Sequence, residues 1–283
     1  MALRSYLHST FDPRRIPGLA AWYDAADSAS ITLDSGRVSQ WSDKSGNARH
    51  ATNTTSGSTQ PSYSTAARNG LNVLRFAAAS VQRLTVASSA ATFKFLHDGT
   101  ECYFAAVSVY GTSSNPDAAY ALFGNNGNAS ANRGVLFAYD DRNIPGTYVA
   151  SDGLLCFSSI GGVGNPFRTT NASVSAPIST YDNIFTPQAI VVQEAVFDAD
   201  NATASQRLRV RLNGGSELAA NPYTTTPSTE NATLNLQIGA NGNNLQTLDG
   251  DICELLFFNQ LPTAAARDLI RRYLGAKWGV TVG

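Results

Sequence analysis

Short apolar or β-branched runs recur along almost the whole chain, separated by clusters of Gly, Asn, Ser, Thr and Pro. This pattern is typical of strands joined by turns. In the clearest run, residues 207–212, arginine alternates with leucine or valine, which places charge on one face of a strand and apolar side chains on the other. The predicted strands are 19–23, 38–41, 73–76, 83–86, 103–110, 119–123, 134–139, 147–150, 154–158, 189–197, 207–212, 234–238 and 252–258.

The end of the chain follows a different period. Apolar residues spaced three and four apart predict an amphipathic helix over 263–278, lying across an open end or a face of the strands. Thr263 is placed to cap its start, and Gly279 to end it. The residues expected on its buried face are Leu269, Ile270, Tyr273, Leu274 and Trp278.

We therefore predict an all-β fold, a two-sheet antiparallel jelly-roll sandwich with a C-terminal α-helix and a short N-terminal arm. The arm is 1–17, where two prolines favour extended backbone, and the sandwich with its helix is 18–283. The stretch 161–187 is rich in Gly, Ser, Thr and Asn. It is either a long loop or a region with short strands, and the sequence leaves both open.

The composition argues against two classes of function, nucleic-acid binding and membrane insertion. Of the 283 residues 14% are charged, with 20 basic against 21 acidic, which argues against a nucleic-acid partner. No run approaches the ~20 apolar residues of a membrane helix, so membrane insertion is not expected, and no secretory signal is recognisable at the start.

Three cysteines, Cys102, Cys156 and Cys253, stand in separate apolar runs without a metal-type spacing. We expect buried thiols, with a single disulfide as the alternative.

Four stretches, taken in order, carry a resemblance: 18–27, 38–50, 209–214 and 248–259, the last followed by the helix ending at 279. Together they resemble the concanavalin A-like lectin/glucanase superfamily in its LamG-like jelly-roll branch, over about residues 18–279. Such domains occur in bacterial surface proteins and in structural proteins of tailed bacteriophages. The resemblance implies a concanavalin A-like sandwich.

The superfamily also contains glycoside hydrolases, which carry carboxylates at alternate positions of one strand. None of the five glutamates here has a carboxylate two residues away. Asp249-Gly250-Asp251 has the spacing but is expected at a turn, and His8, His50 and His97 fall in the arm or at turns. We therefore predict no catalytic residues and no enzyme.

Relatives in this superfamily often bind Ca²⁺ through loop oxygens, so calcium is the one cofactor considered. The selected candidates are Asp43 with Asn47 in one turn and Asp198 with Asp200 in another, while the alternative is that these residues only cap and form turns.

Aromatic side chains at the ends of strands are the candidates for stacking on a sugar. Trp22, Trp41 and Trp278 lie inside regular elements and are expected in the core. The candidate glycan contacts are Tyr110, Tyr139, Tyr148, Tyr181 and Tyr223.

The basic arm, with Arg4, Arg14 and Arg15, either reaches a neighbouring subunit or packs along its own sandwich. Because the resemblance is to domains that occur in structural proteins of tailed bacteriophages, it implies a non-enzymatic bacteriophage virion protein with a lectin-like jelly roll, a capsid decoration or a tail or fibre component. Its partners would be other virion proteins, further copies of itself and host-surface glycans. The alternative is a free-standing carbohydrate-binding lectin, with or without a dependence on Ca²⁺.

Overall fold

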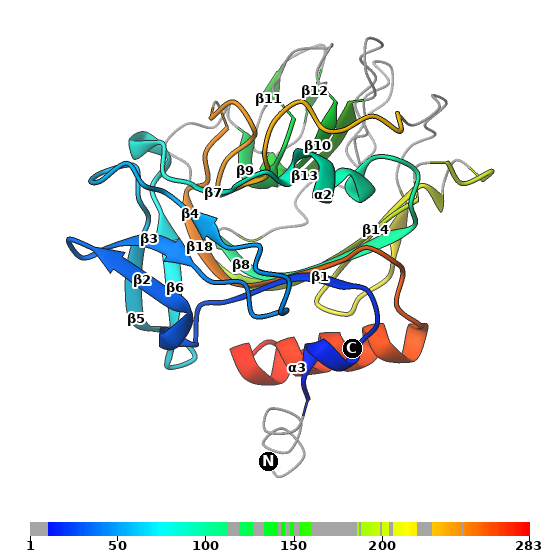
Figure 1. The fold of residues 1–283 in the computed structure, drawn as a ribbon. Coiled ribbons are helices and arrows are strands. Elements are labelled where there is room, and N and C mark those ends of the chain that lie inside the picture. Colours follow the sequence, from blue (N-terminus) through cyan, green and yellow to red (C-terminus); the bar gives the residue numbers. More distant parts are fainter. Residues whose placement is uncertain are drawn as a thin grey trace.

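The chain folds into a curled antiparallel sheet with one long helix packed on its outer face (Figure 1). The computed structural model describes residues 11–111, 119–126, 133–140, 143–144, 148–149, 153–159, 186, 188–198, 200–203, 206–219, 228–244 and 246–283. The predicted all-β sandwich with a C-terminal helix is confirmed. Of the stretch 161–187, only residue 186 lies within the described residues.

The strands of the sheet are hydrogen-bonded in the order β13-β10-β9-β17-β7-β4-β3-β5-β6-β18-β8-β14-β15-β16, and every described pairing is antiparallel. β1 adds to β18 and β2 adds to β3. Their bounds are β1 Leu19–Asp24, β2 Ile31–Asp34, β3 Arg37–Trp41, β4 Ala51–Thr52, β5 Ser62–Arg68, β6 Leu71–Phe76, β7 Leu84–Val86, β8 Cys102–Tyr110, β9 Ala119–Gly124, β10 Gly134–Asp140, β13 Gly153–Ser159, β14 Ile190–Phe197, β15 Leu208–Leu212, β16 Leu218–Ala219, β17 Gln237–Ile238 and β18 Gly250–Phe258. A separate pair joins β11 Asn143–Ile144 to β12 Tyr148–Val149.

Strands β8, β14 and β18 form the middle of one layer, and almost every residue in them is buried. Each strand has two covered faces, because the sandwich core lies on one face and the helix on the other. This explains their near-continuous apolar sequences, whereas β15, farther out, keeps the predicted alternation of buried Leu208 and Val210 with Arg209 and Arg211.

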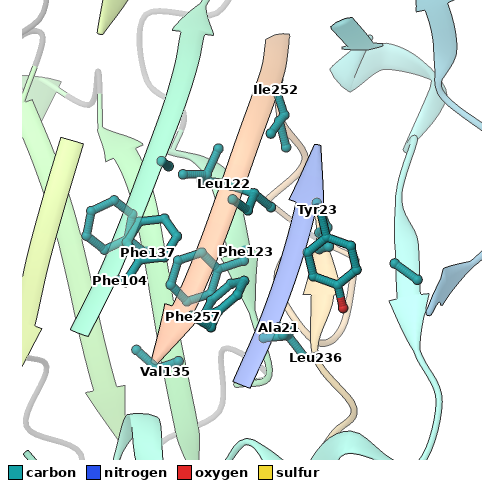
Figure 2. Packing of buried hydrophobic residues seen from close by; sticks show 14 of the residues in the cluster. Ala21, Tyr23, Phe104, Leu122, Phe123, Val135, Phe137, Leu236, Ile252 and Phe257 are labelled. Carbon is teal, nitrogen blue, oxygen red and sulfur yellow. The ribbon is translucent and has the colours of Figure 1, made fainter. Parts of the chain in front are cut away.

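The core between the layers is aromatic at its centre (Figure 2). The ring of Phe104 lies 4.8 Å from that of Phe123 and 5.1 Å from that of Phe257, measured between centroids. Phe123 and Phe257 meet edge to face at 5.0 Å, a favoured geometry for aromatic pairs. Strands far apart in sequence are thus joined by side chains as well as by the backbone ladder.

The helix α3, Ala264–Trp278, begins and ends as predicted. The Thr263 hydroxyl accepts a hydrogen bond from the Ala266 amide, and Gly279 closes the helix in the left-handed region. Ile270, Tyr273, Leu274 and Trp278 are buried against β8, β14 and β18. Leu269 was expected on this face, but it is 42% exposed because it points away from the sheet.

The short helical turns are η1 Pro13–Arg15, η2 Ser28–Ser30, η3 Ala78–Ser80, α2 Ser89–Thr92 and η4 Lys94–Leu96. In the part of the chain described here, no helix is long and apolar enough to cross a membrane.

The three tryptophans are buried, as predicted. Cys102 and Cys253 are buried, as predicted, and the side chain of Cys156 lies outside the described residues.

Candidate functional site

A cavity of about 340 Å³ opens where β18 begins, at one end of the sheet. We call it the Asp249 cavity. Its polar lining consists of Arg68, Arg75, Gln188, Asp249 and Asp251. The volume is at the lower end of the range of small-molecule sites, which suits a ligand of one or two rings.

Strand register brings these residues together. Asp251 pairs with Arg75 of β6 on one side of β18 and with Val109 of β8 on the other. Gly250 takes a φ of +149°, and a Cβ there would meet the Val109 carbonyl oxygen at 2.0 Å. Only glycine fits this close approach, which sets Asp249 and Asp251 on either side of it.

Asp251 is held between two arginines. Arg75 donates from Nε to Oδ1 at 2.7 Å, and Arg68 donates from Nε to Oδ2 at 3.0 Å. The hydrogen bond to Asp251 raises the pKa of Arg75. The carboxylate of Asp251 is 2% exposed, and a buried carboxylate needs such partners to offset its lost hydration. Its role is therefore to fix both guanidinium groups at the cavity wall.

Asp249 differs from Asp251. Among the described residues, no donor or cation lies within bonding distance of its carboxylate. Its backbone is fixed, since the carbonyl oxygen accepts from the Gly111 amide at 2.7 Å. A Cβ on Gly111 would lie 2.5 Å from Oδ2 of Asp249, so the carboxylate packs closely over that glycine. The cavity thus holds a free carboxylate acceptor close to two anchored guanidinium donors.

A second cluster of charged groups lies between α3 and the sheet, and we call it the Lys277 network. Asp24 and Glu254 are direct cross-strand neighbours on β1 and β18. Lys277 donates to Asp24 at 2.6 Å and to Glu254 at 2.8 Å, which removes the repulsion between the carboxylates. The indole N–H groups of Trp22 and Trp278 and the Tyr273 hydroxyl also donate to Glu254. This network is closed to solvent and ties the helix to the sheet.

Its titration is shifted accordingly. Burial opposes ionisation of Asp24, but Lys277 and Lys44 outweigh it and lower the pKa of Asp24. Burial also opposes the charge on Lys277, yet Glu254 and Asp24 raise the pKa of its ammonium group. Burial and the Glu254 carboxylate hold the pKa of Tyr273 well above its usual value.

The predicted calcium ligand Asp43 has a clear local task. Its carboxylate accepts four hydrogen bonds, from the amides of Trp22, Ser45 and Arg49 and from the Ser45 hydroxyl. Asn47 donates to the carbonyl oxygens of Leu19 and Ala20, so both residues pin the turn to β1.

The other predicted ligands are farther along the chain. The carboxylate of Asp198 accepts a hydrogen bond from the side-chain amide of Asn201 at 2.5 Å, and Asp200 is exposed. Within the described ranges no group of three or more His, Cys, Asp and Glu side chains is arranged to hold a metal. Calcium binding at these residues stays a prediction.

Two of the predicted glycan contacts are placed differently from expectation. Tyr110 and Tyr139 are 2% and 1% exposed and stack on each other at 4.7 Å inside the core. A buried ring offers no face to a sugar, so this assignment is corrected. The Tyr148 side chain and all of Tyr181 and Tyr223 lie outside the described residues.

The described part of the arm packs along its own chain. The ring of Phe11 lies 4.9 Å from that of Tyr273 on α3. Arg14 pairs with Asp12 and, like Arg15, is exposed, whereas Arg4 lies outside the described residues. His97, expected at a turn, is buried, and burial lowers its pKa.

Sequence reasoning noted the spacing of Asp249 and Asp251 but missed Arg68 and Arg75. Their only signal was a pair of arginines in a β-hairpin, which is common on solvated strands.

Comparisons with known proteins show the fold. No family model matches the chain, and no curated protein matches it in sequence. A GH54 α-L-arabinofuranosidase matches in structure with a TM-score of 0.56 and 12% identity, over 97% of this chain and 66% of that one. Domain 4 of AbnA, a GH43 extracellular arabinanase from Geobacillus stearothermophilus in complex with arabinotriose, matches with a TM-score of 0.53 and 14% identity, over 90% and 99%. An arabinofuranosidase complexed with arabinofuranosyl-α-1,2-xylobiose matches with a TM-score of 0.51 and 17% identity, over 87% and 52%.

The chain therefore shares its jelly-roll-like β-sandwich with domains of carbohydrate-active proteins. The prediction that it is not an enzyme is corrected, because the proteins that share this fold include arabinofuranosidases. The comparisons give no support for a bacteriophage particle.

Proposed function

We propose that this protein is a carbohydrate-binding domain and that its ligand occupies the Asp249 cavity. The observation that carries the proposal is the free carboxylate of Asp249 beside the guanidinium groups of Arg68 and Arg75, in a cavity of about 340 Å³.

This combination suits a sugar. A sugar hydroxyl both donates and accepts a hydrogen bond, so neighbouring hydroxyls can donate to Asp249 and accept from the arginines. Asp251 uses only the Nε and Nη2 atoms of Arg75, and Nη1 has no partner among the described residues. The arginines are pre-positioned, so little side-chain entropy is lost when a ligand binds.

The fold neighbours supply the first ligands to try. One is in complex with arabinotriose and another with an arabinofuranosyl-xylobiose, so pentose oligosaccharides are the first ligands to test.

The test is calorimetric titration of the full chain with arabinotriose, xylobiose and cellobiose. We expect Asp249→Asn and Arg75→Gln each to weaken binding about tenfold, since each removes a charge-assisted hydrogen bond. Asp34→Asn on β2 and the exposed Arg272→Gln on α3 are matched controls and should bind as the wild type does. Absence of binding across the panel, or equal affinity of Asp249→Asn and the wild type, would overturn the proposal.

The narrower prediction of a LamG-like virion protein, with other virion proteins and copies of itself as partners, stays a separate proposal. Light scattering on the full chain and on a chain lacking residues 1–17 tests its assembly arm. Loss of a trimer or larger species on truncation would support it, and monomers in both cases would remove self-assembly through the arm.

A further inference from the structure

A second polar site lies on the outer face of the sheet, at the margin that α3 leaves uncovered. Arg209 and Arg211 point from β15 to the same face as Glu194 of β14, and α3 contributes Arg267 and Arg271. We call the depression between these side chains the Arg267 notch.

Glu194 is already neutralised within the chain. Arg271 donates to its two carboxylate oxygens at 2.6 and 3.2 Å, and the Tyr103 hydroxyl donates at 2.5 Å. The Arg271 side chain is 9% exposed, which makes this a shielded, well-formed pair. Glu194 therefore supports the notch wall and leaves the remaining arginines to other partners.

The other arginines are less well matched. Arg209 reaches the partly exposed Glu101 at 3.1 Å, and Arg211 approaches Glu217 only to 3.9 Å. Arg267 has no acidic partner among the described residues. Around the notch, one cationic group is thus left without a counter-charge.

Two hydrogen-bond donors are also unused. The Nε atoms of Arg209 and Arg267 are shielded from bulk solvent and have no partner. Buried polar atoms in native proteins are normally paired, so two unpaired N–H groups from neighbouring elements call for an acceptor. The notch has a free volume of about 10 Å³, enough for one water-sized atom group.

We propose that the Arg267 notch binds one oxyanion group, a carboxylate or a sulfate, of an acidic sugar. One oxygen of the group would sit between the two Nε donors, and the rest would face solvent. Guanidinium groups suit this because their planar N–H donors match oxyanion geometry. That the carrier is a sugar rests on the proposed function; the oxyanion site itself rests on Arg209 and Arg267.

The test observes the Nε–H groups directly. Two-dimensional ¹H–¹⁵N spectra of the full chain, in low-salt chloride buffer, would be recorded with glucuronate, glucose, acetate and inorganic sulfate. The arginine Nε resonances are assigned through Arg209→Lys and Arg267→Lys. We expect glucuronate to shift both resonances, and glucose to leave them unmoved. Acetate and sulfate carry an oxyanion without a sugar, so comparing their affinities with that of glucuronate distinguishes a general oxyanion site from one that prefers an acidic sugar.

Arg267→Gln should weaken glucuronate binding about tenfold, whereas Arg272→Gln on the same helix should leave it unchanged. Arg267 forms no ion pair with described residues, so the variant is expected to fold, and its unfolding midpoint checks this. If no oxyanion moves the Nε resonances, or if Arg267→Gln binds glucuronate as tightly as the wild type, the proposed oxyanion site is overturned. Shifts with acetate and sulfate but not glucuronate would overturn the sugar carrier. Whether a sugar binds in the Asp249 cavity is tested separately, by comparing the affinity of Asp249→Asn with that of the wild type.

Discussion

The Lys277 network and the Asp249 cavity use the same kinds of groups in opposite ways. In the network, two carboxylates share one buried ammonium, and Glu254 also accepts from two indoles and a phenol. In the cavity, two arginines hold Asp251, while the carboxylate of Asp249 has no partner among the described residues.

The two clusters show how a carboxylate that holds the fold together differs from one that is available to a ligand. A buried carboxylate with all its acceptor positions used has nothing to offer a ligand, and removing its cationic partner is strongly destabilising because the charge is then left buried and unpaired. A carboxylate held beside a cavity with its acceptors free costs little while water hydrates it and can exchange that water for hydroxyls. Removing a network residue should therefore change stability, and removing a cavity residue should change binding.

Lys277→Met is the substitution with the largest expected effect. It leaves Asp24 and Glu254 buried without a cation, and we expect a loss of about 3–5 kcal/mol in the free energy of unfolding. Urea denaturation measures it. Lys44→Met is the control, because that side chain is 22% exposed and should cost about 1 kcal/mol. Similar losses in the two variants would show that the network is not the main anchor of α3.

The network also predicts a pH dependence. The folded-state pKa of Asp24 lies below 3.8, so its stabilisation is complete above that pH and is lost as pH falls through the folded-state value. The pKa of Lys277 lies above 10.5, so its contribution is complete below pH 10.5 and is lost as pH rises through the folded-state value. Unfolding midpoints between pH 2 and 12 should fall at both ends. In Lys277→Met the alkaline fall should shrink; an unchanged profile would contradict the assignment.

Asp43→Ala tests the turn against β1. The carboxylate accepts four hydrogen bonds, and its removal should cost about 1–3 kcal/mol in thermal or urea unfolding. Because these bonds use both oxygens, we expect EDTA to leave the wild-type melting temperature unchanged. A drop with EDTA that added calcium reverses would instead favour the predicted metal site.

Gly111→Ala tests whether oligosaccharide binding depends on the position of the Asp249 carboxylate. The new methyl group would lie 2.5 Å from Oδ2 of Asp249 and would push the carboxylate out of place. We expect oligosaccharide binding to weaken about tenfold, with a smaller change in stability. Unchanged affinity by calorimetry would mean that the position of Asp249 is unimportant.

Phe11→Ala should have the smallest effect, about 1 kcal/mol in unfolding, because its ring is only half-buried and its one ring contact is with Tyr273 of α3, at 4.9 Å between centroids, among the described residues. A loss above about 3 kcal/mol would make the arm part of the core.

Local patterns were enough to predict part of the fold. The alternation in β15 and the Thr263 and Gly279 signals of α3 depend on neighbours in sequence, and the structure keeps them. The exposure of Leu269 was missed, because it neighbours Ile270 in sequence but lies about 100° around the helix axis from it, outside the buried face.

The candidate site depended on contacts far apart in sequence. Arg68 and Arg75 lie 183 and 176 residues before Asp251. The register of β6 against β18 brings Arg75 to Asp251, and the pairing of β5 with β6 brings Arg68 there. Tyr110 was misplaced for a related reason: a strand end faces solvent or core depending on which layer covers it.

We propose that Asp249 binds a sugar because nothing in the described chain satisfies its carboxylate. The most direct measurement is the oligosaccharide dissociation constant of Asp249→Asn and of the wild type, in parallel with their urea unfolding midpoints. We expect Asp249→Asn to bind about tenfold more weakly than the wild type at an unchanged unfolding midpoint. Equal binding by the two proteins, or a loss of binding that follows a loss of stability, would contradict it.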